Sequence, residues 1–405
     1  MLRETKGIPL NRRDLLKTIG TGALAAGAMM LPKVVQAEEN PAAAVEDRGS
    51  TIRITELTAT VAAGRVFLRL NTNHRISGWG EIKGVEPNVA ATLARSLFEL
   101  LDGENPTRIE FIWQKLYRSH RNIRGGAFMV HTISAIDMAL WDIAGKLWRE
   151  PVWRLLGGPC RDKVRMYPSA TAVKLGTGPQ EFASNPAAIQ GLVNAVKQAR
   201  EKVGPNGSVM FDAHGALPPP TVIQFANAIE PYDVLFIEEP WVPGNIEVCK
   251  KIRAAVKVPL ATGERDRTIW GVIPYLQEQV IDIIQPDCGY GGGISQMKKI
   301  AAIAEAYYVP LAPHNTQSYL GLTASLHVAA SVPLFLIHEG YDNAKLGEIA
   351  RRRWSVDKDG YASLPEGVGL CVDIDEAALA KAAAEPAAGK QWNNPRLPDG
   401  SVADY

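Results

Sequence analysis

The sequence predicts an α/β protein in which a parallel β/α barrel follows a smaller α+β domain. Short apolar segments alternate with amphipathic helical patterns about every 25 residues beyond residue 205. Earlier segments alternate apolar and polar residues, as antiparallel strands do. The chain has 405 residues, of which 46% are hydrophobic and 21% charged, enough for two domains and unlike a disordered or coiled-coil protein. A net charge of +1 does not favour binding of nucleic acid.

The first 37 residues are set apart as a predicted export signal. Arg12 and Arg13 are adjacent, an uncharged stretch runs from Thr18 to Leu31, and small residues close the segment at Ala37. The stretch has 14 residues, whereas a membrane-spanning helix needs about 20, so we expect no stable membrane insertion. The pattern resembles a twin-arginine signal and predicts a periplasmic or otherwise exported protein, with a cytoplasmic location as the alternative. Residues 38–50 are predicted to form a flexible leader.

Residues 51–160 are predicted to form the α+β domain. Residues 51–70 have the alternation of antiparallel strands, and residues 87–101 and 106–119 have the spacing of amphipathic helices. The clearest helix follows, because apolar residues recur at steps of three and four from Ile133 to Leu147. This stretch therefore predicts a long helix as the centre of the first domain.

Residues 161–340 are predicted to form the barrel, and residues 341–405 a C-terminal segment that follows it. The clearest strands of the barrel are 208–212, 234–239, 259–264, 281–287, 309–314 and 335–339. Each ends in a polar residue, and these are Asp212, Glu238, Glu264, Asp287, His314 and Glu339, at steps of 23 to 27 residues. Such a step holds one strand, one helix and two short loops. In a parallel barrel, these side chains would meet at the rim formed by the C-terminal ends of the strands.

Acidic groups gathered at one rim repel one another unless a cation compensates their charge. Asp212, Glu238 and Glu264 come from consecutive strands and offer only carboxylate oxygens, which predicts a site for Mg²⁺, with Mn²⁺ as a substitute. Only one of Glu238 and Glu239 can face inward, because side chains alternate along a strand. The regular step of 26 residues selects Glu238.

Two histidines are candidates for proton transfer. His314 and Asp287 end neighbouring strands, which lie about 5 Å apart in a sheet, so the carboxylate can orient the imidazole and raise its basicity. This predicts His314 as a general base with Asp287 as its partner. His214 lies two residues after Asp212, so its side chain points to the same side of the strand. We interpret His214 as an acid rather than as a fourth metal ligand. His327 and His338 are expected to be structural.

From about residue 51 onward, the chain resembles the enolase superfamily, in its mandelate racemase subgroup. The resemblance is carried by Trp79-Gly80-Glu81, the helix Ile136 to Lys146, Leu156-Gly157-Gly158, Phe211-Asp212-Ala213-His214, Ile237-Glu238-Glu239-Pro240, Thr262-Gly263-Glu264, Gln285-Pro286-Asp287, Pro313-His314-Asn315 and His338-Glu339. It implies a modified TIM barrel under an α+β capping domain, with the C-terminal segment returning to that domain. It also implies Mg²⁺ at the three strand ends and removal of the proton α to a carboxylate.

Two differences from other members of the subgroup indicate which branch of it the chain resembles. Lys174-Leu175-Gly176 lacks the second lysine of racemases and lactonising members, whereas His214 is what galactonate-type acid-sugar dehydratases carry. The resemblance therefore implies that His314 removes the α-proton, that Mg²⁺ stabilises the enediolate, and that His214 protonates the departing 3-hydroxyl. Glu339 would bind a substrate carboxylate oxygen, and the product would be a 2-keto-3-deoxy sugar acid. A cycloisomerase, an epimerase and a non-catalytic sugar-acid-binding protein are the alternatives.

The substrate is expected to be a small sugar acid, and the family suggests a homo-oligomer. Arg75, Arg121 and Arg124 are candidates for substrate binding, because loops around 71–80 and 118–126 are expected to close over the rim; solvated loop charges are the alternative. Lys174 is a further candidate for substrate binding, and in the isomerase alternative His214 or a displaced Lys174 would act together with His314.

The first barrel helix is predicted to be missing. About four residues separate the strands expected at 164–167 and 172–175, whereas a parallel crossover needs about a dozen. Either the barrel is incomplete, or residues 164–175 form one rearranged strand.

Overall fold

A computed structural model describes residues 50–177, 186–340, 344–385, 396–397 and 399–402. These residues all belong to one compact unit, Arg48–Tyr405. The predicted export signal and nearly all of the predicted leader lie outside the described residues.

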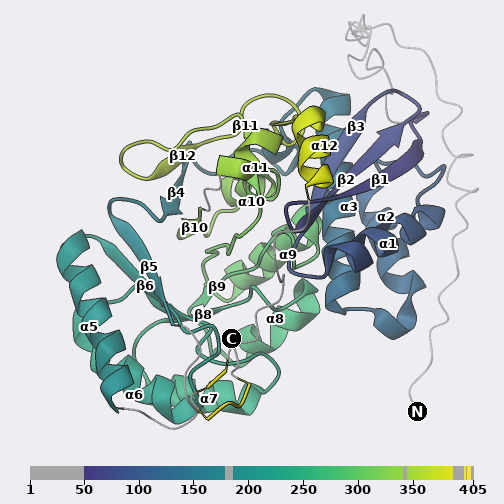
Figure 1. Cartoon of the computed structure of the whole chain (residues 1–405). Helices are drawn as coiled ribbons and strands as arrows, with labels where there is room; N and C mark the ends of the chain where they lie inside the picture. Colours follow the sequence, from purple (N-terminus) through teal and green to yellow (C-terminus); the bar gives the residue numbers. More distant parts are fainter. Residues whose placement is uncertain (1–49, 178–185, 341–343, 386–395, 398, 403–405) are drawn as a thin grey trace, which may run out of the picture. The chain divides into compact units, whose positions relative to one another are not determined.

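The N-terminal part is a three-stranded antiparallel sheet packed against helices (Figure 1). Its elements are β1 (Ile54–Ala62), β2 (Arg65–Thr72), β3 (Ser77–Ile82), α1 (Pro87–Leu97), α2 (Ile109–Ser119) and α3 (Ala127–Trp148). Strand β2 lies between β1 and β3. The predicted α+β capping domain is therefore confirmed.

Helix α3 lies directly on strand β3. A Cβ atom on Gly80 would come 1.9 Å from the carbonyl oxygen of Ala135, and one on Gly78 would come 2.0 Å from that of Ala139. Only glycine allows this close approach. The helix is long and apolar enough to span a membrane, but 83% of its most apolar window is buried inside the protein, as in the core helix of a soluble domain.

Two aspartates of α3 bind distant parts of the chain. Asp137 accepts hydrogen bonds from the backbone N–H of Ser295, at 3.0 Å, and from its hydroxyl, at 2.5 Å. Asp142 accepts hydrogen bonds from the N–H groups of Leu370, at 2.9 Å, and Trp79, at 3.0 Å. The helix signature found in the sequence therefore joins the capping sheet, the barrel and the C-terminal segment.

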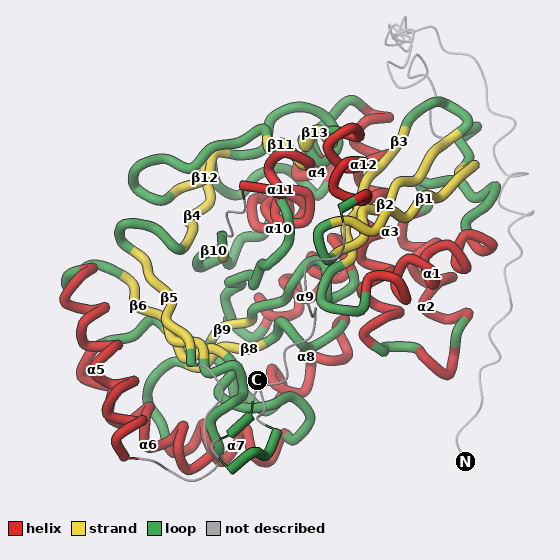
Figure 2. Tube along the Cα trace, viewed as in Figure 1, coloured by secondary structure: helices red, strands yellow, loops and turns green. Residues whose placement is uncertain are grey.

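The barrel alternates strands and helices, as predicted (Figure 2). Its parallel strands are β4 (Lys163–Tyr167), β5 (Ala172–Gly176), β6 (Ser208–Asp212), β7 (Phe236–Glu238), β8 (Leu260–Thr262), β9 (Ile283–Ile284) and β10 (His338–Glu339), with Leu311 and Phe335 bridging β9 towards β10. Its helices are α5 (Pro186–Val203), α6 (Pro219–Ile229), α7 (Ile246–Ala255), α8 (Thr268–Gln277), α9 (Gly293–Ala306) and α10 (Tyr319–Ser331). The predicted modified barrel is confirmed.

The first barrel helix is missing, as predicted. Residues 168–171 join β4 directly to β5 through a turn, and the two strands belong to different sheets. One edge of β4 pairs in parallel with β10, while the other pairs antiparallel with β12 (Tyr361–Ser363). The alternative of one continuous strand over 164–175 is therefore wrong, and the strand ladder is interrupted between β4 and β5.

The remaining described elements are short. They are α4 (Val152–Leu155), α11 (Ala344–Ile349), β11 (Ala350–Arg352), β13 (Val372–Ile374), α12 (Glu376–Ala384) and the 3-10 helices η2 (Phe98–Leu100), η3 (Arg121–Ile123) and η4 (Glu230–Tyr232). The C-terminal segment also contacts the capping sheet, where Arg69 of β2 pairs with Glu376 at 2.9 Å.

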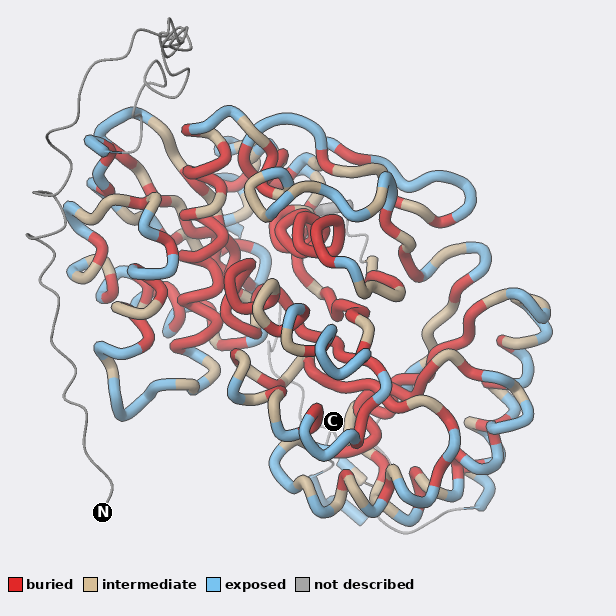
Figure 3. The backbone as a smooth tube through the Cα atoms, turned by 180° about the vertical axis from the view of Figure 1, so that it is seen from behind, coloured by how far each residue is buried: buried red, intermediate tan, exposed pale blue. Residues whose placement is uncertain are grey.

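Buried residues follow the barrel strands and helix α3 (Figure 3). Inside the barrel, each strand contributes a buried side chain to one apolar cluster; these are Tyr167, Ala172, Met210, Phe236, Ala261, Ile283, Ala312 and Ile337. Such a packed interior is usual for this architecture. It leaves the C-terminal rim of the strands as the place for polar chemistry.

Candidate active site

Three carboxylates meet at the rim of the barrel. Asp212 ends β6, Glu238 ends β7, and Glu264 follows β8 by two residues. One oxygen atom from each lies within 4.8 Å of the others. Asp212 and Glu238 are buried and Glu264 is partly buried. Hard oxygen donors at this separation fit a divalent cation, so the triad can hold a metal ion.

Lys174 of β5 points into this cluster. Its Nζ lies 3.1 Å from Asp212 Oδ2, 3.1 Å from Glu238 Oε1 and 2.8 Å from Glu339 Oε1. Burial lowers the pKa of Lys174, but the surrounding carboxylates, Glu238 foremost, outweigh it and raise that pKa above its ordinary value. Lys174 is therefore a fixed positive charge among the carboxylates.

Glu239 faces away from the triad, as the strand period predicts. Its Oε1 pairs with Nε of Arg265 at 2.5 Å. Of the sequence pair Glu238-Glu239, only Glu238 belongs to the metal-binding cluster, while Glu239 is paired with Arg265.

His314 and Asp287 form a buried pair beside the triad. Nδ1 of His314 lies 2.8 Å from Asp287 Oδ2 and donates a hydrogen bond to it. The other oxygen, Oδ1, accepts hydrogen bonds from the N–H groups of Gly289, at 2.6 Å, and Tyr290, at 3.1 Å, and from Gln317 Nε2, at 3.1 Å. The carboxylate is thus held on both sides and fixes one nitrogen of the imidazole.

The second nitrogen of His314 faces the carboxylates. Its Nε2 lies 3.5 Å from Glu264 Oε2 and 3.8 Å from Glu339 Oε2. Burial lowers the pKa of His314, but Glu264, the hydrogen bond to Asp287 and Glu339 together raise it well above its ordinary value. Because Asp287 holds Nδ1, Nε2 is the ring atom that faces a substrate bound at the triad. A divalent cation held by Glu264 would offset that carboxylate's effect on the pKa and so favour the neutral imidazole that a base requires.

His214 lies beside Asp212. Its Nε2 is 3.2 Å from Asp212 Oδ2, and its Nδ1 donates to the carbonyl oxygen of Thr177 at 2.9 Å. The hydrogen bond to Asp212 raises the pKa of His214 to about 9, against the effect of burial. Because both ring nitrogens face acceptors, the imidazolium form satisfies both, which suits a proton donor.

Glu339 ends β10 between the dyad and Lys174. Its Oε2 accepts a hydrogen bond from the N–H of Asn315 at 3.0 Å, and its Oε1 pairs with Lys174. The neighbouring His338 points elsewhere and binds the hydroxyl of Ser325 at 2.6 Å, in keeping with its expected structural role.

The candidate arginines lie in different surroundings from Lys174. Arg75 is exposed in the turn between β2 and β3, and Arg121 is exposed in a short helical turn after α2. Arg124 is exposed and lies over the ring of Tyr117, 5.6 Å from its centroid. Arg75 occupies the end of the sheet opposite Lys83, because β3 runs from that turn towards the barrel.

The end of β3 is the part of the capping sheet that contacts the rim, which the sequence patterns do not predict. Glu81 is buried, pairs with Arg65 and accepts a hydrogen bond from the N–H of Ser318 at 3.0 Å. Lys83 Nζ donates to the carbonyl oxygen of Thr316 at 2.7 Å, two residues beyond His314. Burial, helped by Arg65, lowers the pKa of Lys83 to about 8. Its position directly after the Trp79-Gly80-Glu81 motif was the available signal.

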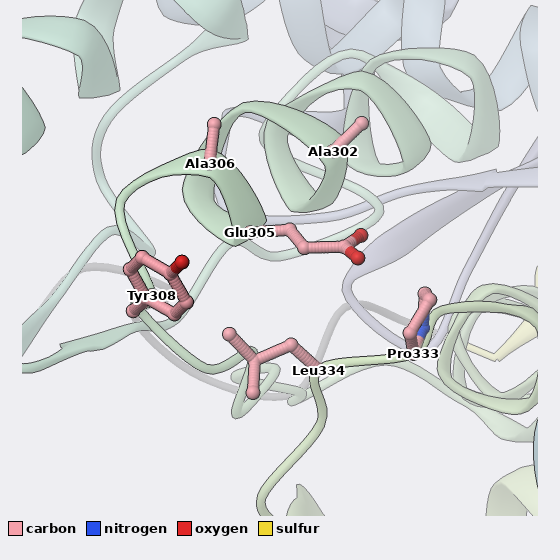
Figure 4. A pocket seen from close by; sticks show the side chains of 6 residues that line it. All are labelled: Ala302, Glu305, Ala306, Tyr308, Pro333 and Leu334. Carbon is pink, nitrogen blue, oxygen red and sulfur yellow. The ribbon is translucent and has the colours of Figure 1, made fainter.

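A surface hollow of about 630 Å³ is lined by the residues that Figure 4 shows. It lies where the chain enters the last strands, at the opposite end of the barrel from the rim. It is lined by Ala302, Glu305, Ala306, Tyr308, Pro333 and Leu334, which belong to the end of α9 and to the segments leading into the last strands. In a barrel of this kind the chemistry lies at the C-terminal ends of the strands, so this hollow is separate from the site.

Sequence comparisons place both parts of the chain in known families. Residues 44–157 match the family described as mandelate racemase / muconate lactonizing enzyme, N-terminal domain, and residues 160–378 match the enolase C-terminal domain-like family. The D-galactonate dehydratase of Xanthomonas oryzae pv. oryzae (strain PXO99A) is 34% identical over 388 residues, covering 87% of this chain and 100% of that protein. The D-galactonate dehydratase of Ralstonia pickettii (strain 12J) is 33% identical with the same coverage.

Solved structures show the same similarity. A mandelate racemase/muconate lactonizing enzyme from Sulfitobacter sp. has a TM-score of 0.80 and 29% identity, covering 88% of this chain and 100% of that one. A mandelate racemase/muconate lactonizing enzyme-like protein from Roseovarius sp. TM1035 has a TM-score of 0.79 and 29% identity, with coverage of 86% and 99%.

Proposed function

Because the chain belongs to the mandelate racemase and muconate lactonizing enzyme group of the enolase superfamily, we propose that it is a Mg²⁺-dependent acid-sugar dehydratase. It would remove the proton α to the substrate carboxylate, eliminate the 3-hydroxyl as water and yield a 2-keto-3-deoxy sugar acid. The observation that carries the proposal is the carboxylate triad flanked by the His314–Asp287 pair and by His214. The names of the curated relatives support the same reaction class.

Asp212, Glu238 and Glu264 would hold the metal ion. When bound, Mg²⁺ would act as a Lewis acid towards the negative charge that develops on the substrate carboxylate. Lys174 and Glu339, paired at 2.8 Å at the edge of the triad, would contact the substrate carboxylate and fix its orientation.

His314 would act as the general base through Nε2. Its Nδ1–H donates to Asp287, which fixes the tautomer, so the lone pair of Nε2 is directed towards the rim. Transfer of the α-proton to Nε2 breaks the C–H bond and leaves its electron pair on the substrate. Asp287 stabilises the imidazolium that results.

His214 would act as the general acid. Hydroxide is a poor leaving group, and a proton from the imidazolium lets the 3-hydroxyl depart as water. The C–O bond breaks with its electron pair, a C2–C3 double bond forms, and the resulting enol tautomerises to the ketone. One molecule of water is therefore lost for each molecule of product.

The test is a screen of aldonates and uronates, beginning with D-galactonate, incubated with Mg²⁺ and assayed for 2-keto acids. We expect turnover by the wild-type enzyme and no turnover by the His314→Ala variant. Exchange of the α-hydrogen in D₂O without loss of water would point instead to an epimerase or cycloisomerase. Saturable binding without turnover, unchanged in His314→Ala, would point to a binding protein.

Export and assembly remain predictions. The Arg12-Arg13 pattern supports export through the twin-arginine pathway, and cell fractionation of an Arg12→Lys/Arg13→Lys variant tests it. We expect the variant to stay in the cytoplasm while the wild type leaves it. Light scattering would test the expected homo-oligomer.

A further inference from the structure

We propose that Tyr290 is a positioning residue for His314, and that the capping-domain residues Lys83 and Gly84 hold Tyr290 in place. The docking of the capping domain would then set the geometry of the base. This inference rests on the proposed function, in which His314 transfers the proton.

Tyr290 contacts the His314–Asp287 pair in two ways. Its ring lies against the imidazole of His314, with 5.9 Å between the centroids and an interplanar angle of 37°. Its backbone N–H donates to Asp287 Oδ1 at 3.1 Å, and the other oxygen of that carboxylate holds His314. A displacement of Tyr290 would therefore reach both members of the pair.

A second histidine, His131 of α3, also packs on Tyr290. The two rings stack with 4.6 Å between centroids and an interplanar angle of 9°. His131 is buried, and its Nδ1–H donates to the carbonyl oxygen of Lys83 at 2.8 Å. The tyrosine ring thus contacts one histidine from the capping domain and another from the barrel.

The loop after β3 holds the phenol end of Tyr290. A Cβ atom on Gly84 would lie 2.9 Å from Cε1 and Cζ of the tyrosine, so the absence of a side chain lets the loop rest on the ring. The tyrosine hydroxyl is hydrogen-bonded to Thr316 Oγ1 at 3.0 Å, and Lys83 Nζ donates to the carbonyl oxygen of the same threonine. Adjacent capping residues therefore contact both Tyr290 and its hydrogen-bond partner.

This arrangement has a catalytic consequence because proton transfer depends steeply on geometry. Asp287 fixes only the Nδ1 side of His314, whereas the ring contact with Tyr290 limits how the imidazole tilts. A displacement of about 1 Å can reduce a rate by about 100-fold. The predicted loss is in kcat rather than in KM, since Tyr290 acts through His314.

The test compares Tyr290→Leu with Tyr290→Phe. The first readout is the downfield proton resonance of His314 Nδ1–H, assigned by its loss in His314→Asn. We expect the wild-type resonance to persist in Tyr290→Phe, which keeps the ring, and to broaden or shift in Tyr290→Leu. The second readout is turnover of D-galactonate with Mg²⁺, where we expect kcat to fall about tenfold or more in Tyr290→Leu with KM nearly unchanged.

Two matched controls separate positioning from general damage. Tyr275→Leu removes a buried tyrosine that is bonded to Asp266, and should leave the His314 resonance unchanged. Gly84→Ala and Gly64→Ala strain backbones of similar φ, +79° and +73°, but only position 84 has a neighbouring ring, so only Gly84→Ala should shift the resonance.

A wild-type resonance in both Tyr290→Leu and Gly84→Ala would overturn the proposal. A wild-type protein that shows the resonance but does not turn over acid sugars would instead contradict the proposed function, while the resonance would still decide whether Tyr290 positions His314.

Discussion

Replacing His327 with glutamine is expected to remove part of the protein's sensitivity to acid. The side chain is fully buried on α10 and is bonded at both ring nitrogens. Nδ1 accepts a hydrogen bond from the N–H of Trp153 at 3.1 Å, and Nε2–H donates to the carbonyl oxygen of Leu370 at 3.1 Å. These partners require the neutral imidazole, because protonation at Nδ1 would break the bond from Trp153.

The sign and size of the effect follow from the pKa of His327. Burial lowers the pKa from 6.5 to about 4 in the folded protein. The unfolded chain takes up the proton first, so the stability that His327 provides above pH 6.5 is lost as the pH falls towards 4. At pH 5, a pKa difference of this size corresponds to about 2 kcal/mol of unfolding free energy.

Urea unfolding at pH 7.5 and pH 5, followed by tryptophan fluorescence, measures this contribution of His327 to the free energy of unfolding. Other buried groups, among them His131 and His338 with pKa values lowered to about 4, titrate alike in both proteins, so the comparison isolates His327. On going from pH 7.5 to pH 5, the free energy of unfolding of His327→Gln, whose amide can keep both hydrogen bonds, should change by about 2 kcal/mol less in the destabilising direction than that of the wild type. Equal changes in the two proteins would refute the assignment of a buried neutral imidazole to His327.

Three further substitutions test the site and the capping domain. Asp287→Asn is expected to lower kcat about 100-fold or more with little change in melting temperature, because the amide no longer fixes the His314 tautomer; an unchanged rate would contradict this. Lys174→Met is expected to raise the affinity for Mg²⁺ about tenfold in titration calorimetry, since the ammonium lies 3.1 Å from two of the carboxylates; equal or weaker binding would argue against it. Gly80→Ala should destabilise the protein by about 3 kcal/mol or more, because Cβ would clash with Ala135. Wild-type thermal stability in this variant, measured by circular dichroism, would disprove the close packing.

The barrel and the acidic cluster could be predicted because they follow from local regularities. A repeat of about 25 residues fixes the order of the strands, and parallel strands bring their ends to one rim. The alternation of side chains along a strand is enough to place Glu238 and Glu239 on opposite sides. In the structure, Glu239 accordingly pairs with Arg265. Asp287 and His314 meet because their strands are neighbours.

The capping contacts could not be predicted in the same way. A hairpin pattern shows that strands pair, but not which end of the sheet faces the barrel. That direction is set by tertiary contacts such as Glu81 with Ser318, and it places Lys83 at the rim and Arg75 at the far end. The interruption between β4 and β5 also depends on tertiary contacts, because β12 pairs with one edge of β4.

The aspartates of α3 couple the unfolding of the two domains. Asp137 and Asp142 bind backbone groups 158 and 228 residues away in the sequence, so detaching either domain would leave buried polar groups without partners. The capping domain and barrel should therefore melt in a single calorimetric transition. Neither the capping domain nor the barrel, expressed alone, should adopt the fold that it has in the whole protein.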